Sequence, residues 1–76
     1  MITGGQVKAA RQLLGWSQVR LAGHSNLAES SISRFEIGGH LPPIKVAAIR
    51  QALETAGVEF IEDNDGGASV RLRTGA

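Results

Sequence analysis

Residues 17–36 constrain the fold of this chain most, because two short helical patterns follow each other there across a tight turn. Ser17 can cap the first helix by accepting a hydrogen bond from a free backbone N–H group. Residues 24–26 are predicted to form the turn, since Asn26 tolerates a left-handed backbone. A second helix is predicted over residues 28–36. Helices joined so closely must cross, so they need small and apolar residues where they meet, which are Leu21, Ala22, Leu27 and Ile32.

Two further helices are predicted on either side of this stretch. Thr3 and Gln6 have the spacing of a capping box, and a helical pattern follows over residues 4–14. Pro43 suits the first turn of another helix, and Gly57 ends that helix. Its inward-facing stripe consists of Val46, Ile49, Leu53 and Ala56.

The last part of the chain changes from a helical to an alternating pattern. Residues 58–62 and 68–73 alternate apolar and polar side chains on both sides of the turn-rich segment 63–67, which predicts a β-hairpin. In the register that suits both faces, the opposed pairs are Phe60 with Val70, Val58 with Leu72, and Glu59 with Arg71.

Composition excludes several classes of protein. The chain contains no cysteine, which excludes disulfide scaffolds, thiolate zinc sites and redox dithiols. No apolar run approaches the ~20 residues that span a bilayer, and the first residues lack the pattern of a signal peptide. We therefore expect a cytoplasmic protein that does not bind membranes.

Enzyme and metal motifs are also missing from the sequence. His24 and His40, the only histidines, do not have the spacing of metal ligands, and no Gly-x-Ser-x-Gly elbow occurs. A calcium loop placed over the turn-rich segment would begin at Ile61 and end at Leu72, neither of which can bind calcium. The sequence predicts no catalytic residue, no metal site and no cofactor.

The charge is distributed unevenly along the chain. Residues 1–50 hold six basic and two acidic residues, a charge of +4. Residues 51–76 hold two basic and five acidic residues, a charge of −3, which leaves the net charge at +1. This asymmetry favours a polyanionic partner for the first part alone.

The motifs between residues 11 and 38 resemble those of lambda-repressor-like, Cro-type helix-turn-helix transcriptional regulators of bacteria and phages, of the xenobiotic-response-element family. The matching residues are Arg11, Leu14, Gly15, Trp16, Ser17, Gln18, Leu21, Ala22, Ile32, Ser33, Arg34, Phe35, Glu36 and Gly38. The resemblance covers residues 5–57. It implies a mainly α fold of four to five helices, with a DNA-binding domain over residues 1–57 and a hairpin extension over residues 58–76.

The resemblance also implies which residues meet DNA. Gln18 corresponds to a residue that holds a DNA phosphate and can brace the recognition helix. The positions of that helix that face the major groove are Glu29, Ser30, Ser33 and Arg34. His40 and Lys45 follow just behind the recognition helix, where we expect them to meet phosphates.

Structural roles follow from the same comparison. Arg11 and Glu36 correspond to a partly buried salt bridge between the first and third helices, and a charge on an apolar helix face needs such a partner. Two positions depart from the family pattern. Asn26 replaces the usual glycine of the turn, and Ala28 replaces the usual Ser or Thr cap, which loses about 1 kcal/mol of capping.

Taken together, these features predict a sequence-specific DNA-binding regulator, a repressor, that binds double-stranded DNA at a palindromic operator as a homodimer. The hairpin face is the candidate dimerisation element, through Phe60, Val70 and Leu72. Packing of that face on the helices of the same chain is the alternative.

Two other functions stay open at this level. The chain could be an antitoxin-like module whose acidic tail binds a basic partner while the helix-turn-helix autoregulates. It could also be a scaffold protein-interaction module that keeps the fold without binding DNA.

Overall fold

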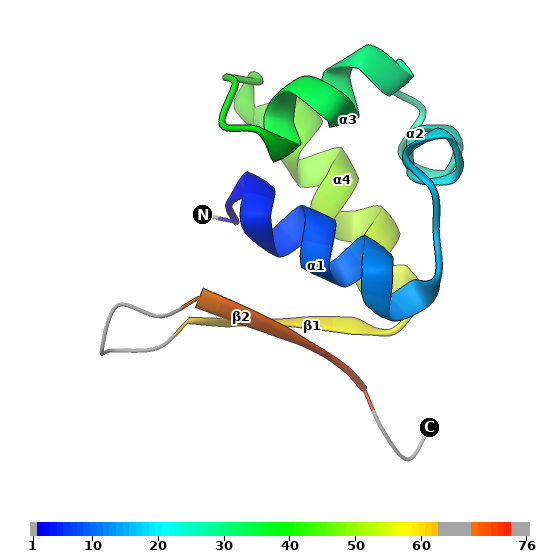
Figure 1. Ribbon diagram of the computed structural model, residues 1–76, viewed down its shortest axis with the longest axis vertical. Helices are drawn as coiled ribbons and strands as arrows, with labels where there is room; N and C mark the ends of the chain where they lie inside the picture. Colours follow the sequence, from blue (N-terminus) through cyan, green and yellow to red (C-terminus); the bar gives the residue numbers. More distant parts are fainter. Residues whose placement is uncertain (1, 63–67, 74–76) are drawn as a thin grey trace.

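The computed structural model describes residues 2–62 and 68–73, and within them it contains four helices followed by a two-stranded antiparallel hairpin (Figure 1). The mainly α fold with a C-terminal hairpin is therefore confirmed. The elements are α1 (Gly4–Leu14), α2 (Gln18–Ser25), α3 (Glu29–Glu36), α4 (Pro43–Thr55), β1 (Val58–Glu62) and β2 (Ala68–Leu72).

Local side-chain bonds fix where α1 and α2 begin. Thr3 Oγ1 accepts from the Gln6 backbone N–H at 3.2 Å, and the Thr3 N–H donates to Gln6 Oε1 at 2.9 Å, which completes the capping box. Ser17 Oγ accepts from the Arg20 backbone N–H at 3.1 Å at the start of α2. By contrast, Ala28 gives α3 no side-chain cap.

The turn between α2 and α3 is shorter than the sequence predicts. Helix α2 continues through Ser25, whose hydroxyl donates to the Leu21 carbonyl oxygen at 2.7 Å within the helix. Asn26 alone adopts the left-handed conformation, at φ 57°. A single left-handed residue is thus enough to redirect the chain into α3.

One apolar core joins the helices to the hairpin. Helix α1 packs against both α3 and β2, and α4 packs against α2 and β1 (Figure 1). The core therefore continues past Gly57 into β1, where Val58 is completely buried. The buried apolar residues are Ile2, Val7, Ala10, Leu21, Ala22, Ile32, Phe35, Leu41, Val46, Ile49, Leu53 and Val58.

The hairpin has the predicted register, with Phe60 opposite Val70, Val58 opposite Leu72 and Glu59 opposite Arg71. Phe60 and Val70 are partly buried against the core of the same chain. A hydrogen bond also ties β2 to α1, from Gln6 Nε2 to the Ser69 carbonyl oxygen at 3.3 Å. The apolar face of the hairpin is thus largely covered by its own helices.

Candidate nucleic-acid interface

Helix α3 has one buried face and one open face. Ile32 and Phe35 point into the core, whereas the opposite side of the helix is polar. On that side Glu29, Ser30 and Arg34 are exposed and Ser33 is half-buried. All four predicted groove-facing residues therefore lie on the side of α3 away from the core, as the helical period requires.

The end of α3 depends on Gly39, which lies against Arg34. The Gly39 N–H donates to the Arg34 carbonyl oxygen at 2.8 Å. A Cβ atom at Gly39 would collide with Arg34 Cγ and lie 2.7 Å from the Arg34 carbonyl oxygen. Only glycine allows this approach, so the loop after α3 runs alongside the stem of Arg34.

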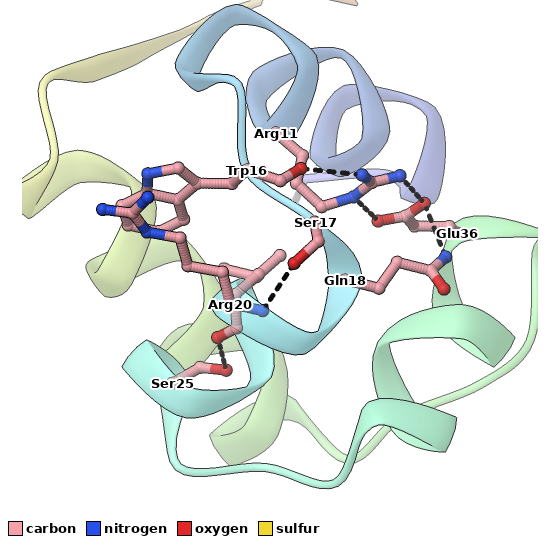
Figure 2. Close-up of polar contacts among 8 residues, drawn as sticks. Arg11, Trp16, Ser17, Gln18, Arg20, Ser25 and Glu36 are labelled. Carbon is pink, nitrogen blue, oxygen red and sulfur yellow. Dashed lines mark hydrogen bonds and ion pairs between the residues drawn. The ribbon is translucent and has the colours of Figure 1, made fainter.

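A charged network fixes α3 to α1 and to the start of α2 (Figure 2). Arg11 Nε donates to Glu36 Oε2 at 2.7 Å, and Arg11 Nη2 donates to Glu36 Oε1 at 2.9 Å. Arg11 Nη1 reaches the Trp16 carbonyl oxygen at 2.9 Å. The side chains of Arg11 and Glu36 are 14% and 3% exposed, so the expected salt bridge is present and shielded from water.

The charges in this network stabilise each other. Burial by itself would raise the pKa of Glu36. The hydrogen bonds from Arg11 and Gln18 and the charge of Arg11 outweigh burial and hold the pKa of that carboxyl below its ordinary value. The hydrogen bond to the carboxylate raises the pKa of Arg11 in turn. Both groups are therefore ionised at neutral pH.

Gln18 belongs to the same network. Its Nε2 atom donates to Glu36 Oε1 at 3.2 Å, so the first residue of α2 is joined to the last residue of α3 (Figure 2). The geometry thus provides the bracing of α3 that the family resemblance implies. Contact of Gln18 with a phosphate stays a prediction.

Comparison with known protein families matches residues 7–60 to a helix-turn-helix family. The chain belongs to the helix-turn-helix family. The matched segment runs from α1 into β1 and includes the whole of α2, the turn at Asn26 and α3. The family consists of DNA-binding transcription regulators. A search of curated proteins gave no match.

The two remaining predicted contacts lie behind the helix-turn-helix. His40 is exposed in the loop after α3, and Lys45 is exposed in the first turn of α4. In the part of the chain that the structure describes, neither forms a hydrogen bond or ion pair with the groove-facing residues of α3. They lie on a separate segment from the Arg11 network.

The structure also shows a stack on the helix-turn-helix that sequence reasoning missed. The rings of Trp16 and His24 lie 4.3 Å apart at 13°, and the Arg20 guanidinium carbon lies 5.3 Å from the Trp16 ring. The sequence signal was present, because Arg20 and His24 are four residues apart and share one face of α2. The stack fixes Trp16 beside α2.

Other kinds of site find no support in the described residues. No three of their His, Asp or Glu side chains gather as a metal site would require. None of the described helices combines the length and apolar character needed to cross a membrane.

Proposed function

We propose that this protein is a sequence-specific transcriptional repressor that places α3 in the major groove of double-stranded DNA. The observation that carries the proposal is the open polar face of α3 on a helix whose other side is fixed by the core and by the Arg11–Glu36 pair. Such a helix can meet base edges without rearranging, and fixed geometry is what direct readout needs.

Each side chain on this face has suitable chemistry. The Arg34 guanidinium can donate two hydrogen bonds to guanine O6 and N7. The hydroxyls of Ser30 and Ser33 can bond bases or phosphates, and the Glu29 carboxylate can accept from a cytosine amino group. Phosphate contacts are proposed for Gln18, His40 and Lys45, in the part of the chain that carries the +4 charge.

Selection of bound sequences from a random DNA pool tests this proposal directly. We expect one motif to be enriched, with affinity that falls as salt rises because phosphate contacts release counterions. Arg34→Ala should weaken binding to that motif by roughly 1–3 kcal/mol and relax its specificity at one base.

The control is Arg71→Ala, which removes the same charge from the hairpin. This variant should bind the selected motif almost as well as the unchanged protein. Equal losses in the two folded variants would mean that Arg34 contributes only general charge. A pool that yields no motif would refute the proposed function.

We further propose that the protein forms a two-fold homodimer. Such a dimer places one α3 in each of two half-sites, so its operator would be palindromic. The hairpin is the proposed dimerisation element. Phe60 and Val70 are partly covered by their own chain, whereas Leu72 at the end of β2 is 40% exposed. Of the three candidate residues Phe60, Val70 and Leu72, Leu72 is therefore the best placed to contact a second copy.

The dimer is best tested on the full chain, because ending it at Gly57 would remove the buried Val58 from the core. Sedimentation velocity should give a dimer for the unchanged protein and a shift toward monomer for Leu72→Asp. A monomeric full chain at concentrations that saturate the selected DNA would contradict dimerisation.

The antitoxin-like and scaffold alternatives predict other results. An antitoxin needs a C-terminal segment that is free to wrap a partner, and the packing of β1 and β2 against α4 and α1 favours the repressor instead. Limited proteolysis separates these cases, since an ordered hairpin resists cleavage within β1 and β2. A scaffold that has lost DNA binding would fail in the selection experiment.

A further inference from the structure

Ile37 is the most exposed large apolar side chain in the part of the chain that the structure describes, at 86%. It directly follows Glu36, the last residue of α3. Apolar side chains gain free energy when they leave water. A single exposed apolar residue is ordinary on a protein surface, so the place of Ile37 in the fold, more than its exposure, decides what it can contact.

The backbone places Ile37 in line with the groove-facing residues of α3. Its φ of −99° and ψ of 16° keep it close to the helical path. With 3.6 residues per turn, Ile37 lies about one turn beyond Ser33 and about two turns beyond Ser30. The open face of α3 therefore ends in an apolar group after a run of polar ones.

The next residue keeps this apolar group uncovered. Gly38 has a φ of +97°, which turns the chain away immediately after Ile37. A Cβ atom added at Gly38 would meet nothing within 4 Å, so the space beside the turn is open. The loop thus leaves the Ile37 side chain available on the same face as Arg34.

The major groove offers one strong apolar partner, the 5-methyl group of thymine. Recognition helices meet base edges mainly through their N-terminal residues, so the reach of Ile37, the C-cap of α3, is counted from Ser33. The four residues from Ser33 to Ile37 span about 6 Å along the helix at 1.5 Å per residue. That distance is less than two base-pair steps of about 3.4 Å, so Ile37 lies within about two base pairs of a base that Ser33 would contact.

We propose that Ile37 is a specificity-determining residue that recognises thymine by contact with its 5-methyl group. The proposal rests on the proposed function, because it requires α3 in the major groove. It adds an apolar reading position to the polar contacts of Ser30, Ser33 and Arg34.

Uracil substitution tests this contact at the level of one methyl group. In the DNA motif selected by the unchanged protein, each thymine is replaced in turn by deoxyuridine, which removes the methyl group and keeps every hydrogen-bonding atom. Fluorescence anisotropy then gives Kd for the unchanged protein, for Ile37→Ala and for Ile44→Ala. Ile44 is the matched control, since it is 80% exposed but belongs to α4.

We expect one thymine at which uracil weakens binding of the unchanged protein by about fourfold, the equivalent of roughly 0.8 kcal/mol for one buried methyl-sized group. The same substitution should have no effect on Ile37→Ala and its full effect on Ile44→Ala. Circular dichroism should show both variants folded, because each truncates an exposed side chain.

Equal uracil effects in the unchanged protein and in Ile37→Ala would overturn the inference while leaving the proposed function intact. Absence of any uracil effect would overturn it as well, and would assign Ile37 to the sugar–phosphate backbone or to a protein partner. If the selection yields no motif, the proposed function fails and this inference fails with it.

Discussion

Replacing Arg11 with methionine removes the guanidinium charge that compensates Glu36 and keeps an apolar side chain about as long as the aliphatic stem of arginine. The Glu36 side chain is 3% exposed and would lose two of its three hydrogen bonds, keeping the one from Gln18. Breaking a buried ion pair from one side costs about 3–5 kcal/mol. Because the Gln18 bond stays, we expect a loss near the lower end, about 3 kcal/mol.

Thermal unfolding followed by circular dichroism measures this loss. At about 4–8 °C per kcal/mol for a domain of this size, Tm should fall by roughly 12–24 °C at pH 7. Arg71→Met is the control, because it breaks the pair with Glu59, in which the side chains are 65% and 41% exposed. We expect its Tm to stay almost unchanged, since water already solvates both charges.

The pH dependence gives a second and independent check. In the unchanged protein the pKa of Glu36 is lowered, so its stabilisation is complete above the unfolded-state pKa and is lost as pH falls through the folded-state pKa. In Arg11→Met, burial without the charge of Arg11 should raise the pKa of Glu36 instead. The buried carboxylate of Glu36 then destabilises the variant fully at pH 7, and this loss of stability shrinks as acid protonates the group. The Tm difference between the two proteins should therefore narrow toward about pH 4.5.

Adding Glu36→Gln to Arg11→Met should recover most of the lost stability at pH 7, since the buried group is then neutral. Equal losses of Tm in Arg11→Met and Arg71→Met, or the same Arg11→Met loss at pH 7 and pH 4.5, would mean that Glu36 is not a buried charge that depends on Arg11.

Three further substitutions test local features of the helices, each by urea unfolding. Gly4→Ala should destabilise the protein by about 1–3 kcal/mol, because the added Cβ would collide with the Phe35 carbonyl oxygen. Gly5→Ala is the control and should not destabilise it, since its Cβ would meet only Thr3 Oγ1, at 3.8 Å. Equal effects would contradict the close approach of α1 to α3. Ala28→Ser should stabilise by about 0.5–1 kcal/mol by supplying the missing cap of α3, and no gain would mean that the hydroxyl does not reach the backbone N–H. Asn26→Val should destabilise by roughly 1–2 kcal/mol, since φ there is 57°; an unchanged midpoint would argue against the left-handed turn.

Local patterns predicted the secondary structure of this chain closely. The capping box of Thr3 and Gln6, the cap at Ser17 and the proline that opens α4 all lie where the sequence places them. Their signals act over three or four residues, so no knowledge of packing is needed. The turn was predicted too long, because α2 continues to Ser25 and Asn26 is its left-handed C-cap, a boundary that residue type does not reveal.

The candidate site was predictable in part for a related reason. The helical period places Ser30, Ser33 and Arg34 on one face of a helix. Once the opposite face is known to pack on the core, this face must point outward. Ile37 carried no such signal, because an isoleucine after the last helical residue is as compatible with burial as with exposure.

From the sequence alone we could therefore place the starts of the helices, the hairpin register and the residues that share the open face of α3, but not the end of α2. Tertiary structure alone decided that Gln18 bonds Glu36, that Gln6 ties β2 to α1, and that Ile37 is left in solvent. These two groups of features differ in how far apart along the chain the interacting residues lie. Caps and periodicity depend on neighbours within a turn, whereas the bond from Gln6 to Ser69 joins residues 63 positions apart and exists only once the core has packed.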